Sequence, residues 1–225
     1  MKFTERLWQR VQPIWDSYLE HPFVEGIGNG TLDKEKFKHW LKQDYIYLID
    51  YARLFAIGAT KATDLDMMTT FGRLVSGTLN TEMTLHRQYA AQFGISEAEL
   101  EATQPASTTM AYTSYMLNLA QRGGVENVIA AVLTCTWSYQ YIGEKLNQIE
   151  GAATHPFYGE WVKMYSSPEF TAFKNDVKAM MDRVTEGLSE PALQALEDIV
   201  VHTSYYEYMF WDMAEKLEMW PVAQY

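Results

Sequence analysis

Hydrophobic residues recur at helical spacing in nearly every segment of this 225-residue chain that lies between its glycines and prolines. Side chains three and four positions apart fall on one face of an α-helix, so the pattern is typical of helices with one buried face. The sequence contains no run of alternating β-branched residues bounded by hairpin signals. The chain is therefore expected to adopt an all-α fold.

Glycine, proline and capping residues set the expected helix boundaries. A first helix is expected over about residues 4–19, followed by a glycine-rich loop over residues 26–30. Thr31 or Asp33 then caps a long helix that reaches about residue 60.

The later segments are read in the same way. One helix is expected over about residues 66–93, with Gly94 in the left-handed conformation that ends it. Ser167 and Pro168 are typical of an N-cap followed by proline at the first helical position. The remaining helices are expected over about residues 108–122, 125–149, 158–165 and 189–220.

Charge and composition exclude several classes of protein. The net charge is −11 and the 18 Lys and Arg residues are scattered, so direct binding to nucleic acid is not expected. The first 15 residues lack the apolar core of a signal peptide, and no stretch has the apolar length of a membrane span. No composition shift marks a second domain. We therefore expect a single domain over residues 1–225, in the cytoplasm and not associated with a membrane.

A metal or nucleotide cofactor is not expected either. Glu82 and His86 stand four positions apart with no second copy, whereas a di-iron bundle needs Glu-x-x-His on two helices. No H-E-x-x-H zinc motif occurs, and the glycines of residues 26–30 follow a helix and not a strand.

The chain has one cysteine, Cys135, so it has neither an intrachain disulfide nor a thiol-rich zinc site. Ala131, Cys135 and Tyr139 recur at intervals of four, which places the thiol and the phenol on one helix face. A lone cysteine is most often a small apolar core residue. The spacing alone leaves both an inert and a reactive cysteine open.

Two other helices offer polar groups among aromatic residues. Asp44, Tyr47 and Tyr51 fall on one face of their helix, either as a groove edge or as part of a binding surface. Glu207 lies within the very apolar run 205–211, where burial of a carboxyl group would raise its pKa and suit it to proton transfer. A buried structural glutamate fits that segment equally well. Together the three helices could line a pocket for a flat, polar, aromatic ligand.

The residues resemble those of the thiaminase II (TenA) family along essentially the whole chain. The stretch HPFVEGIGNGTLDKEKFKHWLKQDYIYLIDYARLFA is similar to the family's opening, and HTSYYEYMFWDMA is similar to its closing helix. Similar stretches between them are Glu82 to His86, residues 111–115, the Cys135 helix and residues 165–170.

The resemblance implies a haem-oxygenase-like helical bundle without haem, a homotetramer, and hydrolysis that recovers the pyrimidine half of thiamin. Cys135 matches the nucleophile of the family's cysteine-bearing branch, and Glu207 its acid/base. Asp44 matches the residue that hydrogen-bonds the aminopyrimidine edge, and Tyr139 the phenol on a ring nitrogen. The aromatic walls of the pocket are matched by Tyr47, Tyr112, Tyr165 and Phe210.

The implied reaction converts 4-amino-5-aminomethyl-2-methylpyrimidine to the 5-hydroxymethyl compound, and cleaves thiamin to the same pyrimidine and its thiazole. Neither requires a metal or organic cofactor. A pyrimidine-binding or regulatory protein without catalysis is the alternative on the same fold. A haem or di-metal oxygenase fits less well, because the five histidines have no paired motif.

Overall fold

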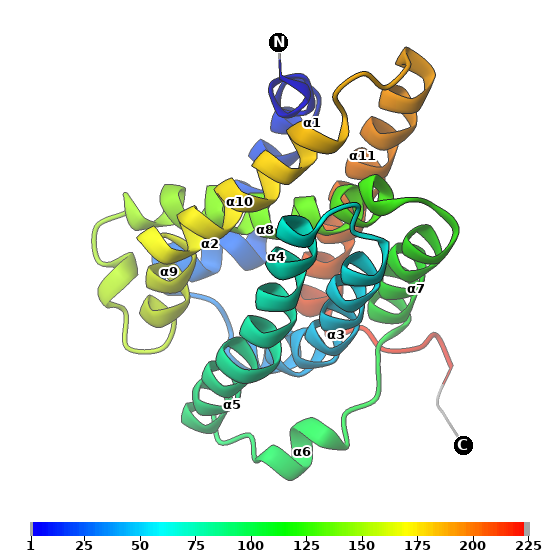
Figure 1. The fold of residues 1–225 in the computed structure, drawn as a ribbon. Coiled ribbons are helices and arrows are strands. Elements are labelled where there is room, and N and C mark those ends of the chain that lie inside the picture. The colour runs from blue at the N-terminus through cyan, green and yellow to red at the C-terminus, as the bar shows by residue number, and fades with distance from the viewer. Residues whose placement is uncertain (1, 223–225) are drawn as a thin grey trace. The chain divides into compact units, whose positions relative to one another are not determined.

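The computed structural model describes residues 2–222, in which every regular element is a helix (Figure 1). The all-α prediction is confirmed. The chain divides into two compact units, each built from separate stretches of sequence. Unit 1 is formed by the chain up to Leu32 together with Ile129–Tyr208, and unit 2 by Asp33–Val128 together with the chain from Met209 onward.

Unit 1 is made of helices from both ends of the sequence. Its α10 packs on α1 and on α9, and its α2 packs on α1. Two long helices, α8 and α11, lie mostly in this unit and pass into the other. The elements are α1 (Phe3–Leu19), α2 (Pro22–Asn29), α8 (Val125–Asn147), the 3-10 turn η2 (Ala152–Thr154), α9 (Gly159–Tyr165), α10 (Pro168–Val184) and α11 (Glu190–Lys216).

The core of unit 1 begins with one face of α1. Leu7, Val11 and Trp15 recur at four-residue intervals, and all three are buried. The Trp15 indole Nε1 donates a hydrogen bond of 2.9 Å to Ser204 Oγ on α11, so the apolar ring is buried without an unsatisfied donor. This bond joins the first and last helices of the chain.

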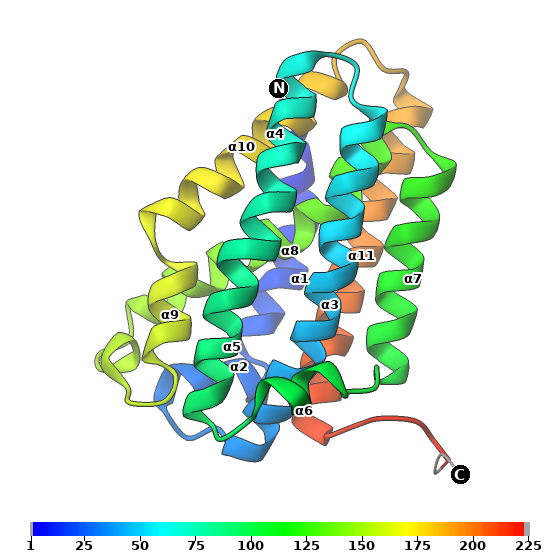
Figure 2. The same ribbon diagram turned by 60° about the horizontal axis from the view of Figure 1, so that its bottom comes forward.

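Unit 2 is organised around its longest helix, α3. Figure 2 shows α3 between α4 and α7, and it packs directly on both. Asp33 caps α3 by accepting a hydrogen bond from the Glu35 backbone, as one of the two predicted N-caps requires. The elements are α3 (Lys34–Lys61), α4 (Leu65–Ser76), the π-helix η1 (Gly77–Glu82), α5 (Met83–Gln92), α6 (Glu97–Glu101) and α7 (Ser107–Arg122).

Three expected boundaries are corrected. Residues 26–30 do not form a loop, because His21 caps α2, Pro22 begins it, and the helix continues to Asn29 before Gly30 takes a left-handed φ of 76°. The helix expected over residues 66–93 is interrupted by η1, although Gly94 does end it with a φ of 76°. The last helix ends at Lys216 and not near Trp220, whose indole instead donates to the Pro105 carbonyl.

Candidate functional site

Cys135 and Tyr139 lie one turn apart on α8, in unit 1. The thiol is half-buried, whereas the Tyr139 ring is buried. That ring packs against Tyr165, with 4.8 Å between centroids, and against Trp161 at 6.0 Å. The structure therefore brings two predicted pocket residues, Tyr139 and Tyr165, into contact.

A glycine on α8 permits this contact. Gly143 lies one turn beyond Tyr139, and a Cβ at Gly143 would fall 2.6 Å from the backbone carbonyl carbon of Tyr165. Such a distance is too short for any other residue without a shift of the backbone. The close approach of α9 to α8 thus sets the position of the Tyr165 ring.

Glu207 is buried on α11, with 2% of its surface exposed. Burial of Tyr18 raises the pKa of its phenol well above the usual value, and the negative charge of Glu207 raises it further. The two groups are therefore near each other. Tyr18 donates its hydroxyl hydrogen to the Ser204 carbonyl, one turn before Glu207. Tyr205 and Met209, two positions away on either side, are exposed on other faces of the helix, whereas Phe210 and Trp211 of the same apolar run are buried.

Asp44 lies on α3 in unit 2, beside a histidine from α5. The Nδ1 atom of His86 is 3.5 Å from Oδ2 of Asp44, and its Nε2 atom is 2.7 Å from the Leu41 carbonyl oxygen. Burial lowers the pKa of His86 to about 4, and the bond to Leu41 only partly opposes this shift. The imidazole is therefore neutral at pH 7, and its contact with Asp44 is not an ion pair.

Tyr47 stands at the centre of an aromatic cluster in unit 2. Its ring centroid lies 5.3 Å from Tyr112, 5.9 Å from Phe210 and 5.4 Å from Tyr51, with which it stacks. All four rings are buried. Three predicted wall residues, Tyr47, Tyr112 and Phe210, are thus in one cluster although they come from three helices.

The predicted residues fall into two groups. Unit 1 holds Cys135, Tyr139, Tyr165 and Glu207, and unit 2 holds Asp44, Tyr47, Tyr112 and Phe210. The chain also places residues beside these groups that sequence reasoning did not assign to the site: Tyr18, Trp161 and His86.

From the sequence, Glu82 was weighed as a metal ligand and lies in a stretch that resembles the family, but it was given no role in the site. It ends the π-helix η1, an element that is frequent at functional sites. Its side chain keeps some exposed surface, but the loss of water around the carboxyl on burial raises its pKa to about 7, and a hydrogen bond with Thr78 opposes this shift. Because the π-helix leaves no mark in the sequence, no local pattern could have singled Glu82 out.

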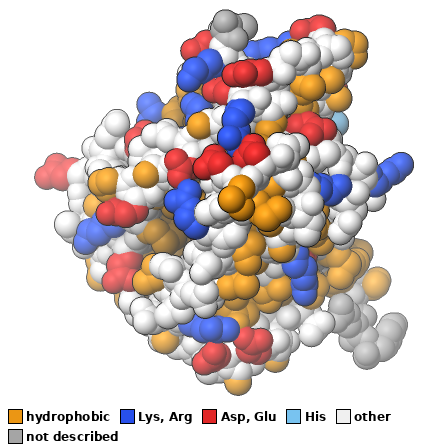
Figure 3. All heavy atoms as spheres, viewed as in Figure 1, with side chains coloured by type: hydrophobic (Ala, Val, Ile, Leu, Met, Phe, Trp, Pro, Cys, Tyr) orange, Lys and Arg blue, Asp and Glu red, His pale blue; other side chains and the backbone are white. Residues whose placement is uncertain are grey.

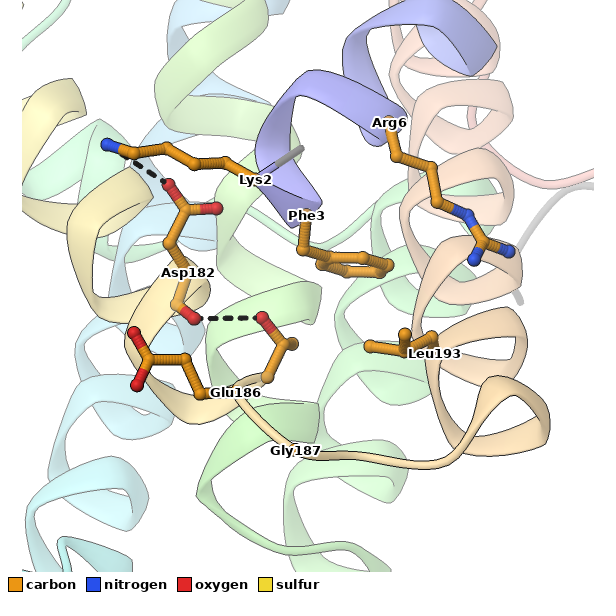
Figure 4. A pocket seen from close by; sticks show the side chains of 8 residues that line it. Lys2, Phe3, Arg6, Asp182, Glu186, Gly187 and Leu193 are labelled. Carbon is orange, nitrogen blue, oxygen red and sulfur yellow. Dashed lines mark hydrogen bonds and ion pairs between the residues drawn. The ribbon is translucent and has the colours of Figure 1, made fainter.

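A hollow on unit 1 contains none of the predicted site residues (Figure 4). Three of its charged side chains have partners: Asp182 accepts a hydrogen bond from the Thr4 backbone at 2.8 Å and lies 4.0 Å from Lys2, while Arg6 binds Glu197 at 2.7 Å. These contacts connect the first turn of α1 to α10 and α11.

On the face drawn in Figure 3, Lys and Arg side chains lie scattered among acidic ones. Within residues 2–222, no three His, Cys, Asp or Glu side chains are grouped so that they could hold a metal ion. In the same part of the chain, no helix combines the length and the apolar character needed to cross a membrane.

Known proteins with similar sequences cover nearly the whole chain. The TENA/THI-4/PQQC family matches residues 8–217. The aminopyrimidine aminohydrolase of Halalkalibacterium halodurans is 55% identical over 220 residues, which make up 98% of this chain and 98% of that protein.

Solved structures share the fold. A TenA family transcription regulator from Silicibacter sp. TM1040 is 30% identical, with a TM-score of 0.88 over 95% of this chain and 96% of that chain. A domain with a haem-oxygenase-like fold from Shewanella denitrificans has a TM-score of 0.78 at 16% identity, over 95% of this chain and 92% of that one. The second likeness concerns the fold alone, and it confirms the predicted haem-oxygenase-like bundle.

Proposed function

This chain belongs to the TENA/THI-4/PQQC family, and we propose that it hydrolyses aminopyrimidines of thiamin salvage with Cys135 as nucleophile and Glu207 as acid/base. The observation that carries the proposal is that the chain is 55% identical to an aminopyrimidine aminohydrolase over 98% of its length. The chain is accordingly a hydrolase. Its substrates are the aminomethylpyrimidine and, by the same chemistry, thiamin.

The first step forms a covalent bond. The Cys135 thiolate adds to the unsubstituted ring carbon beside the carbon that bears the methylene group, and ring electrons then expel the leaving group from the methylene. Water adds to the exposed methylene carbon, and loss of the thiolate restores the aromatic ring. The half-buried state of Cys135 supports this role, because a nucleophilic thiol must be reached by its substrate.

Glu207 donates and accepts protons in these reaction steps. An amine leaves readily only when protonated, so the carboxyl donates a proton to it and then, as a carboxylate, activates the attacking water. Burial of Glu207 supports the role, because a buried carboxyl holds its proton at higher pH than an exposed one.

The other residues bind the ring. Asp44 hydrogen-bonds its amidine-like edge, Tyr139 contacts a ring nitrogen, and the aromatic residues stack on it and exclude water. The contacts of Tyr47 with Tyr112 and Phe210, and of Tyr139 with Tyr165, support this assignment because they hold flat apolar faces in fixed positions.

We also propose that residues 1–225 act as one domain, since a single family match runs from residue 8 to 217. The remaining features follow from the family resemblance: a homotetramer in the cytoplasm that works without nucleic acid, membrane or cofactor.

Turnover tests the proposal directly. The purified chain is incubated with aminomethylpyrimidine and, separately, with thiamin, and hydroxymethylpyrimidine is detected by chromatography. We expect product from both substrates. Binding of hydroxymethylpyrimidine without any turnover of either substrate would contradict the enzyme and favour the pyrimidine-binding alternative.

A further inference from the structure

Unit 1 has another hollow, which lies between α1, α8 and α10. Its volume is about 630 Å³, within the range of pockets that take a small organic molecule. Its aromatic and basic lining residues are Trp8, Trp137, Tyr141, Lys174 and Lys178. None of the residues predicted for the functional site lines it. Its chemistry is therefore separate from the reaction proposed above.

The rings of this hollow form a continuous aromatic surface. Trp8 stacks on Trp137 with 5.7 Å between ring centroids, and it meets Tyr141 edge-on at 5.3 Å. Trp137 is buried against Trp15, whose ring centroid lies 5.2 Å away. Trp8 and Tyr141 each keep part of their surface exposed. A flat ligand can pack on these half-exposed rings, because the buried rings behind hold them in place.

Two lysines of α10 line the same hollow. Lys174 and Lys178 are four positions apart on one face of the helix, and both are half-buried. The ammonium nitrogen of Lys178 lies 3.7 Å from the ring centroid of Trp137, so a positive charge rests on the aromatic surface. Within residues 2–222, neither lysine forms an ion pair with a carboxylate. Burial lowers the pKa of Lys178, and the charge of Lys174 lowers it further.

The acidic residues around the hollow do not neutralise this charge. Asp182 and Glu5 raise the pKa of Lys178, but they only partly offset its lowering, and the ammonium of Lys2 opposes them. Both carboxylates accept hydrogen bonds from backbone N–H groups at the start of α1, at 2.8 Å and 3.1 Å respectively. Glu144, the other acidic lining residue, is exposed, so water and salt screen its charge. The two lysines therefore favour an anion as ligand.

We propose that this hollow binds a small organic anion with an aromatic ring: the ring packs on Trp8 and Tyr141, and the anionic group bridges Lys174 and Lys178. The anion supplies the ion-pair partner that the two ammonium groups lack. The ring covers aromatic surface that water otherwise contacts. The inference goes beyond the proposed function and does not depend on it.

The hollow and the cysteine lie on different sides of α8. Trp137 and Cys135 are two positions apart in this helix, so their side chains point about 160° away from each other around its axis. A ligand in the hollow is therefore expected to leave the pyrimidine site free, and the two ligands should not compete.

Phenyl phosphate is the probe, because it joins an aromatic ring to an anionic group. Benzyl alcohol supplies the ring alone, inorganic phosphate the anion alone, and benzoate a carboxylate in place of the phosphate. In calorimetric titrations of the wild type, we expect phenyl phosphate or benzoate to bind at least about tenfold more tightly than benzyl alcohol and inorganic phosphate. The tighter of the two aromatic anions identifies the preferred anionic group. Benzylamine has the ring with the opposite charge, and equally tight binding of it overturns the inference. Absence of binding by both aromatic anions at about 10 mM does so as well.

Matched substitutions locate the bound probe. Lys174→Gln and Lys178→Gln each remove one charge from the hollow, whereas Lys163→Gln removes an exposed charge of α9 that does not line it. We expect each of the first two to weaken binding of the tighter aromatic anion at least about fivefold, and the third to leave it within about twofold. Trp8→Leu should bring its affinity close to that of the anion alone. Melting temperatures confirm that the variants are folded. Unchanged affinity in either hollow variant, or displacement of the probe by hydroxymethylpyrimidine, overturns the inference and leaves the proposed hydrolase standing.

Discussion

Cys135 differs from serine by one atom, so its chemistry can be removed with little change in packing. We expect Cys135→Ser to lower kcat for aminomethylpyrimidine by about a thousandfold or more, because a hydroxyl is a far weaker nucleophile than a thiolate. Binding of hydroxymethylpyrimidine, measured by calorimetry, should change little. Near-normal turnover by the folded variant would rule out the covalent step.

Glu207→Gln separates the two substrates of the proposed reaction. Loss of the proton donor should depress kcat/KM for aminomethylpyrimidine more than for thiamin, since the amine needs a proton to leave and the thiazole departs neutral from a cationic ring. Both values should fall, because water activation is lost as well. The measurement is the ratio of the two values in wild type and variant, and an unchanged ratio would deny Glu207 the role of acid for amine departure.

His86 makes stability depend on pH. Its pKa is about 4 in the folded chain, against an ordinary value of 6.5, so between these values the unfolded chain binds more protons. Lowering the pH through this window therefore favours unfolding, and the full stabilisation is present only above pH 6.5. In urea unfolding at pH 7 and pH 4, the wild type should lose about 3 kcal/mol more than His86→Gln. Equal losses would show that His86 titrates normally.

Individual site residues are predictable where a local pattern marks them, and their partners are not. The spacing of Cys135 and Tyr139 is visible within one helix, whereas the carbonyl that holds His86 lies 45 positions away in the chain. Helical periodicity says which face is buried but not which neighbour it meets. His86 was therefore weighed as a metal ligand and included in a family-like stretch, but its partners in the fold were not predicted.

Helix α9 can approach α8 closely because Gly143 has no side chain. Gly143→Ala would place its Cβ 2.6 Å from the Tyr165 backbone, so we expect a loss of about 1–3 kcal/mol in unfolding free energy despite alanine's better helix propensity. Displacement of Tyr165 should also raise KM for the pyrimidine.

The matched control is Gly72→Ala in α4, where an added Cβ meets nothing within 4 Å. This variant should gain about 0.5–1 kcal/mol in unfolding free energy and keep its KM. If both variants are stabilised alike, the close approach at Gly143 does not constrain Tyr165.

At the scale of elements, helical periodicity located most of the helices. Two of the three corrected boundaries, at α2 and at η1, have identifiable causes. The glycines of α2 suggested a loop, but a capping histidine and Pro22 at the first position favour a helix more strongly. The π-helix η1 is not marked by a turn residue in the sequence, because its hydrogen-bond register depends on packing with other helices. Local propensity therefore could not reveal it.

The state of assembly is expected from the family resemblance. Leu65 in unit 2 is 77% exposed and Tyr205 in unit 1 is 53% exposed, but single exposed apolar residues are common on monomers and do not by themselves mark an interface. We expect light scattering to give about 104 kDa, four times the 26.0 kDa of one chain. The melting temperature should also rise with protein concentration. A stable 26.0 kDa species at micromolar concentration would contradict the homotetramer.

For the whole molecule, helical periodicity predicted the fold class and the resemblance predicted the architecture. Neither predicted that each compact unit combines separated stretches, because the pattern of a helix does not say which distant helix covers it. The bond from Trp15 to Ser204 joins residues 189 positions apart.

The discontinuous units also govern the order in which this chain can fold as it is made. The first two helices emerge from the ribosome early, but Ile129–Tyr208, which completes their unit, follows only after all of Asp33–Val128. At about 5–20 residues per second, that delay is roughly 5–20 s. Unit 2 has a shorter interval between its two stretches, because only Ile129–Tyr208 separates them, but it is completed last, when the segment from Met209 onward is made. The apolar face of α1 is thus exposed throughout most of synthesis, and this nascent helix is where chaperones would be needed most.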